Sequence, residues 1–384
     1  MSVTAPTGFL AGGVRCGIRK RKPDLAIVRS ATAATGAAMF TANRVQAAPL
    51  VVSREHLGLA EPQAVVVNSG VANAATGVRG ELDARATAAE AARLLDLDAE
   101  QVLVLSTGVI GAPLPLDRVL PGLGSAAAAL SPTGGAAAAE AILTTDTRTK
   151  QAAAEGPGFV VGGMAKGSGM IHPDLATLLA VVTTDYPLEP GEAIQFLRPA
   201  VDESFNSISV DGECSTNDAV VLLANGASGA RRDDAALAEA LAAVCRELAG
   251  QIVADGEGAT VLAEIRVAGA ASGPEAKAIA RRIATSPLLK TALFGHDANW
   301  GRILAAAGSA PYNGGYAHLD AARLTLTLNG VAVVEAGAPS GAEPKLDGTV
   351  CTIDLELGLG DGAAAYLTSD LSYDYVRINA EYRS

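Results

Sequence analysis

The chain has 384 residues, a formal net charge of −12 and 49% hydrophobic residues, of which few are aromatic. The excess of acidic residues argues against a nucleic acid or an anionic membrane surface as partner. No apolar stretch is long enough to cross a bilayer and the N-terminus lacks the apolar core of a secretion signal, so we expect a cytoplasmic protein that is not bound to a membrane.

Cysteine and histidine provide neither a disulfide framework nor a metal site. The cysteines are scattered without a Cys-x-x-Cys spacing, so we expect reduced thiols in a reducing compartment. The histidines have no metal-ligand spacing with one another or with cysteine, so no metal site is predicted. The residues concerned are Cys16, Cys214, Cys245 and Cys351 together with His56, His172, His296 and His318.

The part of the chain before residue 150 alternates strand and helix patterns, which is typical of an α/β fold. The predicted strands are residues 12–18, 24–28, 39–41, 63–67 and 101–105, and the predicted helices are residues 81–97, 121–130 and 135–143.

Small polar residues and glycines follow two of these strands, at residues 68–74 and 106–111. A glycine after a strand lets backbone N–H groups face a ligand, as an oxyanion hole requires, and a plain turn is the alternative. Residues 144–147, TTDT, are interpreted as a helix-end cap. These loops are therefore candidates for a site, without a chemistry of their own.

A glycine-dense segment from Gly162 to Asp174 runs into an apolar, β-prone run that begins at Leu175. The pattern predicts a loop that enters a buried strand, with Thr177 at its start. A phosphate-binding loop is excluded, because Lys166 precedes the last glycines instead of following them. Thr177 is then either an ordinary strand residue or a nucleophile that uses its own α-amine as base, which requires a cut after Ala176.

The remainder of the chain again mixes both kinds of element. We expect a helix opened by residues 189–192, broken at Pro199 and resuming to Phe205, and helices at residues 237–252 and 274–285. The predicted strands are residues 208–210, 219–224, 324–328, 331–334, 350–357 and 363–367, with a hairpin turn at Asn329-Gly330.

Two further motifs can be explained either by a catalytic or binding role or by an ordinary structural one. His296-Asp297 with Ser309 suggests a catalytic triad, but such dipeptides are common and we do not adopt that reading. Glu257, in the loop DGEGAT at residues 255–260, is either a solvated carboxylate or a ligand for an ammonium group. Residues 211–218, DGECSTND, read as a polar turn to which we assign no chemistry.

Residues 166–173, KGSGMIHP, followed by residues 176–179, ATLL, resemble the self-cleaving ornithine acetyltransferases of arginine biosynthesis. These enzymes are also called bifunctional glutamate N-acetyltransferase/amino-acid acetyltransferase. The resemblance extends from the first glycines to the last residue. It implies a layered α/β fold with an N-terminal threonine as nucleophile.

The resemblance also implies a division of the chain and a reaction. Cleavage between Ala176 and Thr177 would give an α chain, residues 1–176, and a β chain, residues 177–384, assembled as α2β2. The implied reaction is a ping-pong transfer of acetyl from N2-acetylornithine to glutamate. No cofactor is implied, although some members of the family also use acetyl-CoA as a substrate for glutamate acetylation.

The site residues are carried over from the family by their motifs. Thr177 would be the nucleophile, and Thr107 with Gly108 would form the oxyanion hole. The chain departs from the family pattern at Ala75, where the family has cysteine, and at Val261, where lysine is frequent. The residues implied to bind substrate are Thr144, Lys166, Thr177, Glu257, Asn379 and Ser384.

Two other functions stay open on sequence grounds. An N-terminal-nucleophile amidase or aminopeptidase of related fold would use the same threonine with water as acceptor. An uncleaved metabolite-binding protein would need neither the cut nor a nucleophile.

Overall fold

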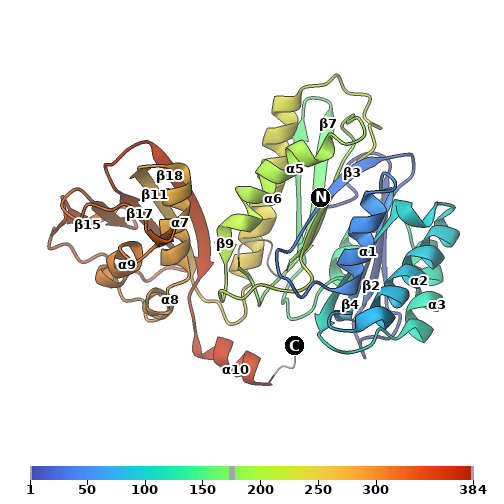
Figure 1. Cartoon of the computed structure of the whole chain (residues 1–384), viewed down its shortest axis with the longest axis horizontal. Helices are drawn as coiled ribbons and strands as arrows, with labels where there is room; N and C mark the ends of the chain where they lie inside the picture. Colours follow the sequence, from blue (N-terminus) through green and yellow to red (C-terminus); the bar gives the residue numbers. More distant parts are fainter. Residues whose placement is uncertain (1, 173–177, 382–384) are drawn as a thin grey trace. The chain divides into compact units, whose positions relative to one another are not determined.

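The computed structural model describes residues 2–172 and 178–381, and the chain divides into two compact units (Figure 1). The first unit comprises the residues up to Asn206 together with Glu213–Ile252. The second comprises Ser207–Gly212 and the described residues from Val253 onward.

The first unit contains a four-stranded sheet with the strand order β1-β2-β4-β5. Its strands pair antiparallel except β4 and β5, which are parallel. β2 and β4 are buried on both faces, as their continuous aliphatic runs require. The strands are β1 (Phe9–Val14), β2 (Leu25–Ser30), β4 (Ala64–Val71) and β5 (Val102–Val109).

The second sheet of this unit has five strands in the order β3-β10-β8-β7-β6. Only β8 and β10 run parallel, and β7 returns antiparallel beside β8. Consequently Lys166 at the end of β7 pairs with Leu179 at the start of β8, and Leu179 pairs with Ala219 on β10. The strands are β3 (Thr35–Phe40), β6 (Lys150–Gly156), β7 (Phe159–Lys166), β8 (Leu179–Thr184) and β10 (Ala219–Ala224).

Helices cover the outer faces of both sheets, which pack on each other through an aliphatic core (Figure 1). Helices α2 and α3 pack on the first sheet, and α5 and α6 pack on the second. The unit is thus layered helix–sheet–sheet–helix. Its helices are α1 (Ala48–Leu57), α2 (Gly77–Leu95), α3 (Leu116–Ala128), α4 (Gly135–Ala141), α5 (Ala193–Asp202) and α6 (Asp234–Ala254), with 3₁₀ turns at Ala99–Gln101 and Phe205–Ser207.

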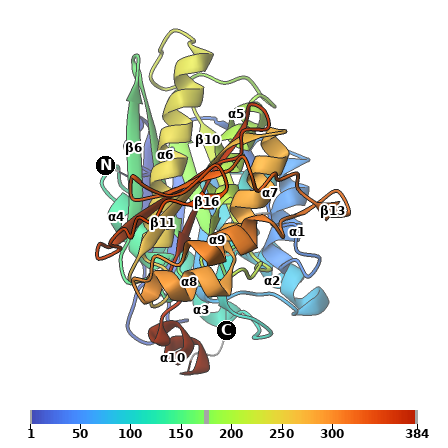
Figure 2. The same cartoon turned by 90° about the vertical axis from the view of Figure 1, so that its left-hand side faces the viewer.

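The second unit is built on a seven-stranded sheet with the order β16-β15-β14-β17-β11-β18-β9. Helices α7, α8 and α9 lie together beside it (Figure 2), and α7 packs on β11 and β18. The helices are α7 (Gly273–Ala284), α8 (Pro287–Phe294), α9 (Trp300–Ala307) and α10 (Tyr373–Glu381). The strands are β9 (Ile208–Ser209), β11 (Leu262–Ala270), β14 (Thr325–Leu328), β15 (Val331–Glu335), β16 (Ala338–Pro339), β17 (Val350–Glu356) and β18 (Gly362–Ser369), with a separate hairpin of β12 (Pro311–Tyr312) and β13 (Gly315–Tyr316).

Two helix predictions were wrong at proline. Pro121 lies inside α3, which begins five residues earlier than predicted, and Pro199 lies inside a continuous α5. Both helices bury an apolar face around the proline, Val119 and Leu123 in α3 and Leu197 in α5, so packing offsets the lost backbone hydrogen bond. The hairpin prediction was right: β14 and β15 join at Asn329-Gly330, both with positive φ.

Helices α1, α8, α9 and α10 had no counterpart among the predicted elements. α8 nevertheless carries a local signal, since the Ser286 hydroxyl accepts a hydrogen bond from the Leu289 amide and Pro287 occupies the first turn. In the described part of the chain, none of the helices combines the length and the apolar character needed to span a membrane.

Candidate functional site

The end of β5 has a backbone form that suits an oxyanion hole. Gly108 has φ +131°, and a β-carbon there would lie 2.3 Å from the carbonyl carbon of Gly70 on β4. Only glycine therefore fits this position. The pairing of β4 with β5 shifts register at Gly70 and Val71, immediately beside the buried Thr107. A register shift of this kind frees backbone groups from the regular ladder, so they can face a ligand.

Two buried asparagines hold this part of the backbone in place. Asn217 donates from Nδ2 to the carbonyls of Ala72 (2.6 Å) and Ser106 (2.8 Å). Asn68 donates to the Val71 carbonyl (2.9 Å) and accepts from the Ser106 hydroxyl (2.6 Å). The loop at residues 68–74 and the loop at residues 211–218 therefore brace the ends of β4 and β5.

A buried ion pair supports the loop that follows β7. The Lys150 ammonium lies 2.7 Å from Asp146 Oδ1, and both side chains are fully buried. Asp146 also accepts from the amides of Gly167 (2.7 Å) and Thr144 (3.0 Å). Burial raises the pKa of Asp146, but the Lys166 and Lys150 charges outweigh it and hold that pKa well below the usual range. Asp146 thus stays charged. Its hydrogen bonds to the Thr144 and Gly167 amides and its attraction to Lys166 keep Thr144 and Lys166, two predicted substrate ligands, close together.

Arg19 connects this ion pair with the end of β5. Its guanidinium donates to the carbonyls of Leu143 (2.6 Å) and Thr144 (3.3 Å). A β-carbon at Gly70 would lie 3.0 Å from Arg19 Cγ, and Gly70 pairs with Gly108. Four of the predicted site residues, Thr107, Gly108, Thr144 and Lys166, therefore lie in one neighbourhood of the first unit.

Glu257 and Asn379 meet in the second unit. Asn379 Nδ2 donates to Glu257 Oε2 at 2.8 Å, and Glu257 is 9% exposed. The Glu257 loop fits closely against the start of α10, where the Ser372 hydroxyl donates to the Gly258 carbonyl (2.6 Å). Gly258 has φ +68°, and a β-carbon there would lie 2.4 Å from the Tyr375 amide nitrogen. The tail of the chain is thus packed against the loop that carries the carboxylate.

Asp370 and Lys290 hold the other side of the same loop. Asp370 accepts from the Thr260 amide (2.8 Å), the Thr260 hydroxyl (2.6 Å) and the Val261 amide (2.9 Å). The buried Lys290 ammonium donates to Thr368 Oγ1 (2.8 Å), and burial lowers the pKa of Lys290 to about 8. Val261, which departs from the family pattern, belongs to the apolar core of this unit.

Three predicted residues lie outside the described part of the chain. They are Ala176 and Thr177, the predicted cleavage site and nucleophile, and Ser384 at the C-terminus. Leu178, the first described residue after the predicted cut, is buried and leads directly into β8.

The rejected triad is not assembled. His296 Nδ1 contacts the Leu346 carbonyl, Asp297 accepts from Asn299, and the Ser309 hydroxyl donates to a carbonyl one turn earlier. All four cysteines are free thiols, and burial raises the pKa of Cys245 to about 12. Within residues 2–172 and 178–381, no three His, Cys, Asp or Glu side chains are grouped in a way that could hold a metal ion.

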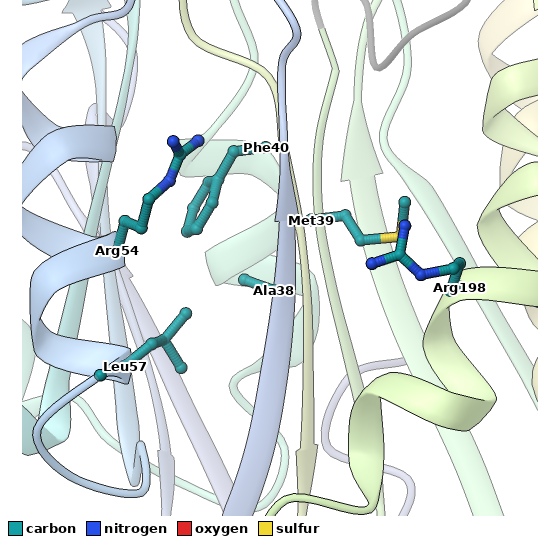
Figure 3. Close-up of a pocket in the computed structure, with 7 residues that line it drawn as sticks. Ala38, Met39, Phe40, Arg54, Leu57 and Arg198 are labelled. Carbon is teal, nitrogen blue, oxygen red and sulfur yellow. The ribbon is translucent and has the colours of Figure 1, made fainter.

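A pocket of about 400 Å³ beside β3 lies apart from these residues (Figure 3). The Arg54 guanidinium from α1 stands 5.3 Å from the centroid of the Phe40 ring, and Arg198 from α5 lies on the other side of the strand. None of the predicted site residues lines it. The lining consists of Ala38, Met39, Phe40, Arg54, Leu57, Gly58 and Arg198.

The sequence was compared with known families and proteins. The model of the ArgJ family matches residues 10–384. The arginine biosynthesis bifunctional protein ArgJ of Symbiobacterium thermophilum is 47% identical over all of this chain and 98% of that protein. The protein of the same name from Mycolicibacterium paratuberculosis is 46% identical over all of this chain and 96% of that protein.

The chain belongs to the ArgJ family.

Among solved structures, ArgJ from Bacillus halodurans is 39% identical over 45% of this chain and 93% of that chain, with a TM-score of 0.40. Ornithine acetyltransferase from Mycobacterium tuberculosis, solved with ornithine, is also 39% identical, over 45% of this chain and 94% of that chain, with a TM-score of 0.40. As a member of the ArgJ family, the protein is an acyltransferase of arginine biosynthesis.

Sequence reasoning missed the supporting residues of this ArgJ-family site. Asp146 stood in the motif TTDT, which we interpreted as a helix cap, and Asn217 and Asp218 stood in a loop without assigned chemistry. One available signal was that each motif is a cluster of small polar residues at the end of a predicted element, a helix for residues 144–147 and strands for residues 211–218. The pairing of Asp146 with Lys150, four residues on, could have been proposed from charge alone.

Proposed function

We propose that the protein transfers an acetyl group from N2-acetylornithine to glutamate through an acetyl-Thr177 intermediate. Thr177 Oγ attacks the acetyl carbonyl, its hydroxyl proton passes by way of its own free α-amine to the departing ornithine nitrogen, and an ester remains. The α-amine of glutamate then attacks the ester, so N-acetylglutamate leaves and the hydroxyl is restored. A terminal amine has a pKa of roughly 7.7–8.0, suitable for this proton transfer near neutral pH.

The observation that supports the proposal is that four predicted site residues lie in the first unit, at strand ends that are linked by hydrogen bonds and ion pairs. Thr107 and Gly108 lie at a register shift, where their backbone groups can stabilise the negative charge on the acetyl oxygen. Lys166 pairs with Leu179, two residues after Thr177 in the sequence. We assign to Lys166, with Thr144 near it, the binding of the substrate's α-carboxylate.

Glu257, Asn379 and Ser384 are proposed to bind the amino-acid side chain of the substrate. The Glu257 carboxylate can pair with the δ-ammonium of acetylornithine, and the hydrogen bond from Asn379 holds it in one orientation. Glutamate has a carboxylate at the equivalent end, so Glu257 favours the donor over the acceptor.

The active form is proposed to arise by self-cleavage between Ala176 and Thr177. The resulting chains, residues 1–176 and 177–384, are proposed to assemble as α2β2 in the cytoplasm. Because curated relatives carry the name "bifunctional", we also propose acetyl-CoA as a second acetyl donor for glutamate.

Mass spectrometry of the purified protein tests the cleavage and the nucleophile together. We expect two fragments that meet between Ala176 and Thr177, and an acetyl adduct on the C-terminal fragment after incubation with acetylornithine. Thr177→Ala is expected to give one uncut chain without transfer. Two fragments from this variant would refute the assignment, and release of free acetate in place of N-acetylglutamate by the wild type would favour the amidase alternative.

A further inference from the structure

Asp218 is a buried carboxyl group that the proposed reaction does not use. It directly precedes β10 and has no solvent exposure. The next residue, Ala219, donates from its amide to the Leu178 carbonyl at 3.1 Å and pairs with Leu179. Asp218 therefore lies beside the first described residue that follows Thr177 in the sequence.

Neither carboxyl oxygen of Asp218 has a hydrogen-bond partner in proper geometry among the described residues. A buried carboxyl whose oxygens lack well-aligned hydrogen bonds is costly, so its presence in a native core calls for a functional reason. Burial raises the pKa of Asp218 well above the usual range, while the Leu178 amide, the Lys166 charge and the hydroxyls of Ser215 and Thr41 lower it only in part. A carboxyl group whose pKa is raised in this way is a stronger base than an exposed carboxylate, so it can take up a proton and release it again.

The surrounding groups leave few other proton carriers. The Thr41 hydroxyl donates to the Ser215 carbonyl at 2.8 Å, and the Ser215 hydroxyl accepts from the Asn217 amide at 3.1 Å. The charged groups on the neighbouring elements are Lys166 and, beyond it, the Asp146–Lys150 pair. Among the described residues, the Cys214 thiol also lies near this group, 3.6 Å from Thr41 Oγ1.

Self-cleavage needs a proton carrier other than the Thr177 α-amine, which is the carrier proposed for the mature enzyme. Before the cut, the α-nitrogen of Thr177 is part of the amide bond with Ala176, so it cannot serve as a base. This point rests on the proposed function. We propose that the Asp218 carboxyl carries the proton during the self-cleavage of the chain.

The step balances with Asp218 as a shuttle. The Asp218 carboxylate takes the proton of the Thr177 hydroxyl while Oγ bonds to the Ala176 carbonyl carbon. As the bond from that carbon to the Thr177 nitrogen breaks, Asp218 returns the proton to the nitrogen, and an ester remains. Water then adds to the ester, which leaves a carboxylate on Ala176 and restores the Thr177 hydroxyl, and the proton released passes to the freed α-amine of Thr177. Asp218 ends in the charge state in which it began.

The full chain made by cell-free synthesis, with aliquots denatured at intervals, gives the cleavage rate directly. Asp218→Asn keeps the shape of the side chain but cannot carry the proton, so we expect cleavage about 10²–10⁴-fold slower than wild type. Asp185→Asn is the matched control, because Asp185 is also buried and follows the opposite end of β8. This control is expected to cleave at the wild-type rate.

The outcomes separate this inference from the proposed function. A wild-type chain that stays uncut would overturn the proposed function first. A wild-type chain that is cut, with Asp218→Asn cut equally fast, would overturn the role of Asp218 alone.

If Asp218→Asn fails to fold, the pH dependence of the cleavage rate in a second variant tests the proposal. Ser215→Ala removes a group that lowers the pKa of Asp218, so the rise of the rate with pH should move to higher pH. An unmoved profile would contradict the proposal.

Discussion

Asp146 shows how single buried residues can set the charge of a site. Two lysines, Lys150 and Lys166, act on one carboxylate, so these three side chains carry one excess positive charge. An excess positive charge in a buried place favours an anionic ligand, such as the α-carboxylate of an amino acid. Glu257, in the second unit, supplies the opposite charge, which an ammonium group would satisfy.

Glu257→Gln should weaken the reaction of acetylornithine more than the reaction of glutamate. The substitution keeps the partner of Asn379 but removes the charge that would pair with the δ-ammonium. Loss of a charge-assisted hydrogen bond costs about 1.5–3 kcal/mol, so we expect kcat/KM for acetylornithine to fall roughly tenfold to a hundredfold. Steady-state kinetics of the two half-reactions measure this, with the exposed Glu335→Gln as control. An equal loss for donor and acceptor would argue against the role of Glu257.

At the scale of elements, paired strand ends hold most of the site. The bulge at Gly70 and Gly108 depends on a close approach of β4 and β5, and loops from distant parts of the chain brace it. In the second unit, the buried Lys290 links α8 with β18, and Asp370, directly after β18, accepts hydrogen bonds from the Glu257 loop. The strands and helices thus hold in position the functional side chains that the loops carry.

Gly108→Ala should damage catalysis more than its backbone strain explains. The new β-carbon would overlap the Gly70 carbonyl, so the strand ends must move and the backbone groups lose their alignment. We expect kcat to fall by about 10²–10³-fold, the range seen when an oxyanion donor is lost. Gly111→Ala is the matched control, because it also has positive φ but no atom within 4 Å of its β-carbon. Equal effects of both substitutions would show that only strain matters.

Lys290 should make the stability of the second unit rise with pH in the alkaline range. Its pKa in the folded chain is about 8, against 10.5 when exposed, so the unfolded chain holds more protons between these values. Stability therefore increases as pH rises from about 8 to 10.5, by up to a few kcal/mol. Urea unfolding at several pH values should show this rise, and Lys290→Met should abolish it. The exposed Lys345→Met serves as control, and a rise that survives in Lys290→Met would contradict the explanation.

At the scale of the whole molecule, the predicted cut divides a single sheet. β3, β6 and β7 precede residue 176 and β8 and β10 follow it, yet β10 and β8 lie between β3 and β7 in one five-stranded sheet. The core between the two sheets of the first unit likewise combines residues from both sides of the cut. Cleavage therefore changes the chain without providing a surface along which the two pieces can part.

The two fragments should remain together after cleavage. Separation would expose the edges of β7 and β8 and the aliphatic core, so we expect one species on native size-exclusion chromatography and two on a denaturing gel. Addition of urea should separate them only in the range where the protein unfolds. Fragments that elute separately without denaturant would contradict this arrangement.

The sequence by itself determined the local features of this protein. Continuous aliphatic runs at residues 63–67 and 219–224 predicted buried strands, because such runs leave no polar face for solvent. Asn329-Gly330 predicted its hairpin, because both residues tolerate positive φ. The motif around Lys166 indicated the family, since it depends on neighbours in sequence alone.

Tertiary structure decided whatever depends on contacts between distant residues. Pro121 and Pro199 stay inside helices because packing offsets a local penalty, and Asn379 reaches Glu257 only because α10 packs on a loop 122 residues earlier. The burial of Asp146 and Lys150, and the lack of well-aligned hydrogen bonds to Asp218, follow from how strands from separate parts of the chain pair. A side chain acquires such surroundings only when the fold removes it from water. The sequence therefore shows which residue stands at a position, but the charge state of that residue depends on the fold.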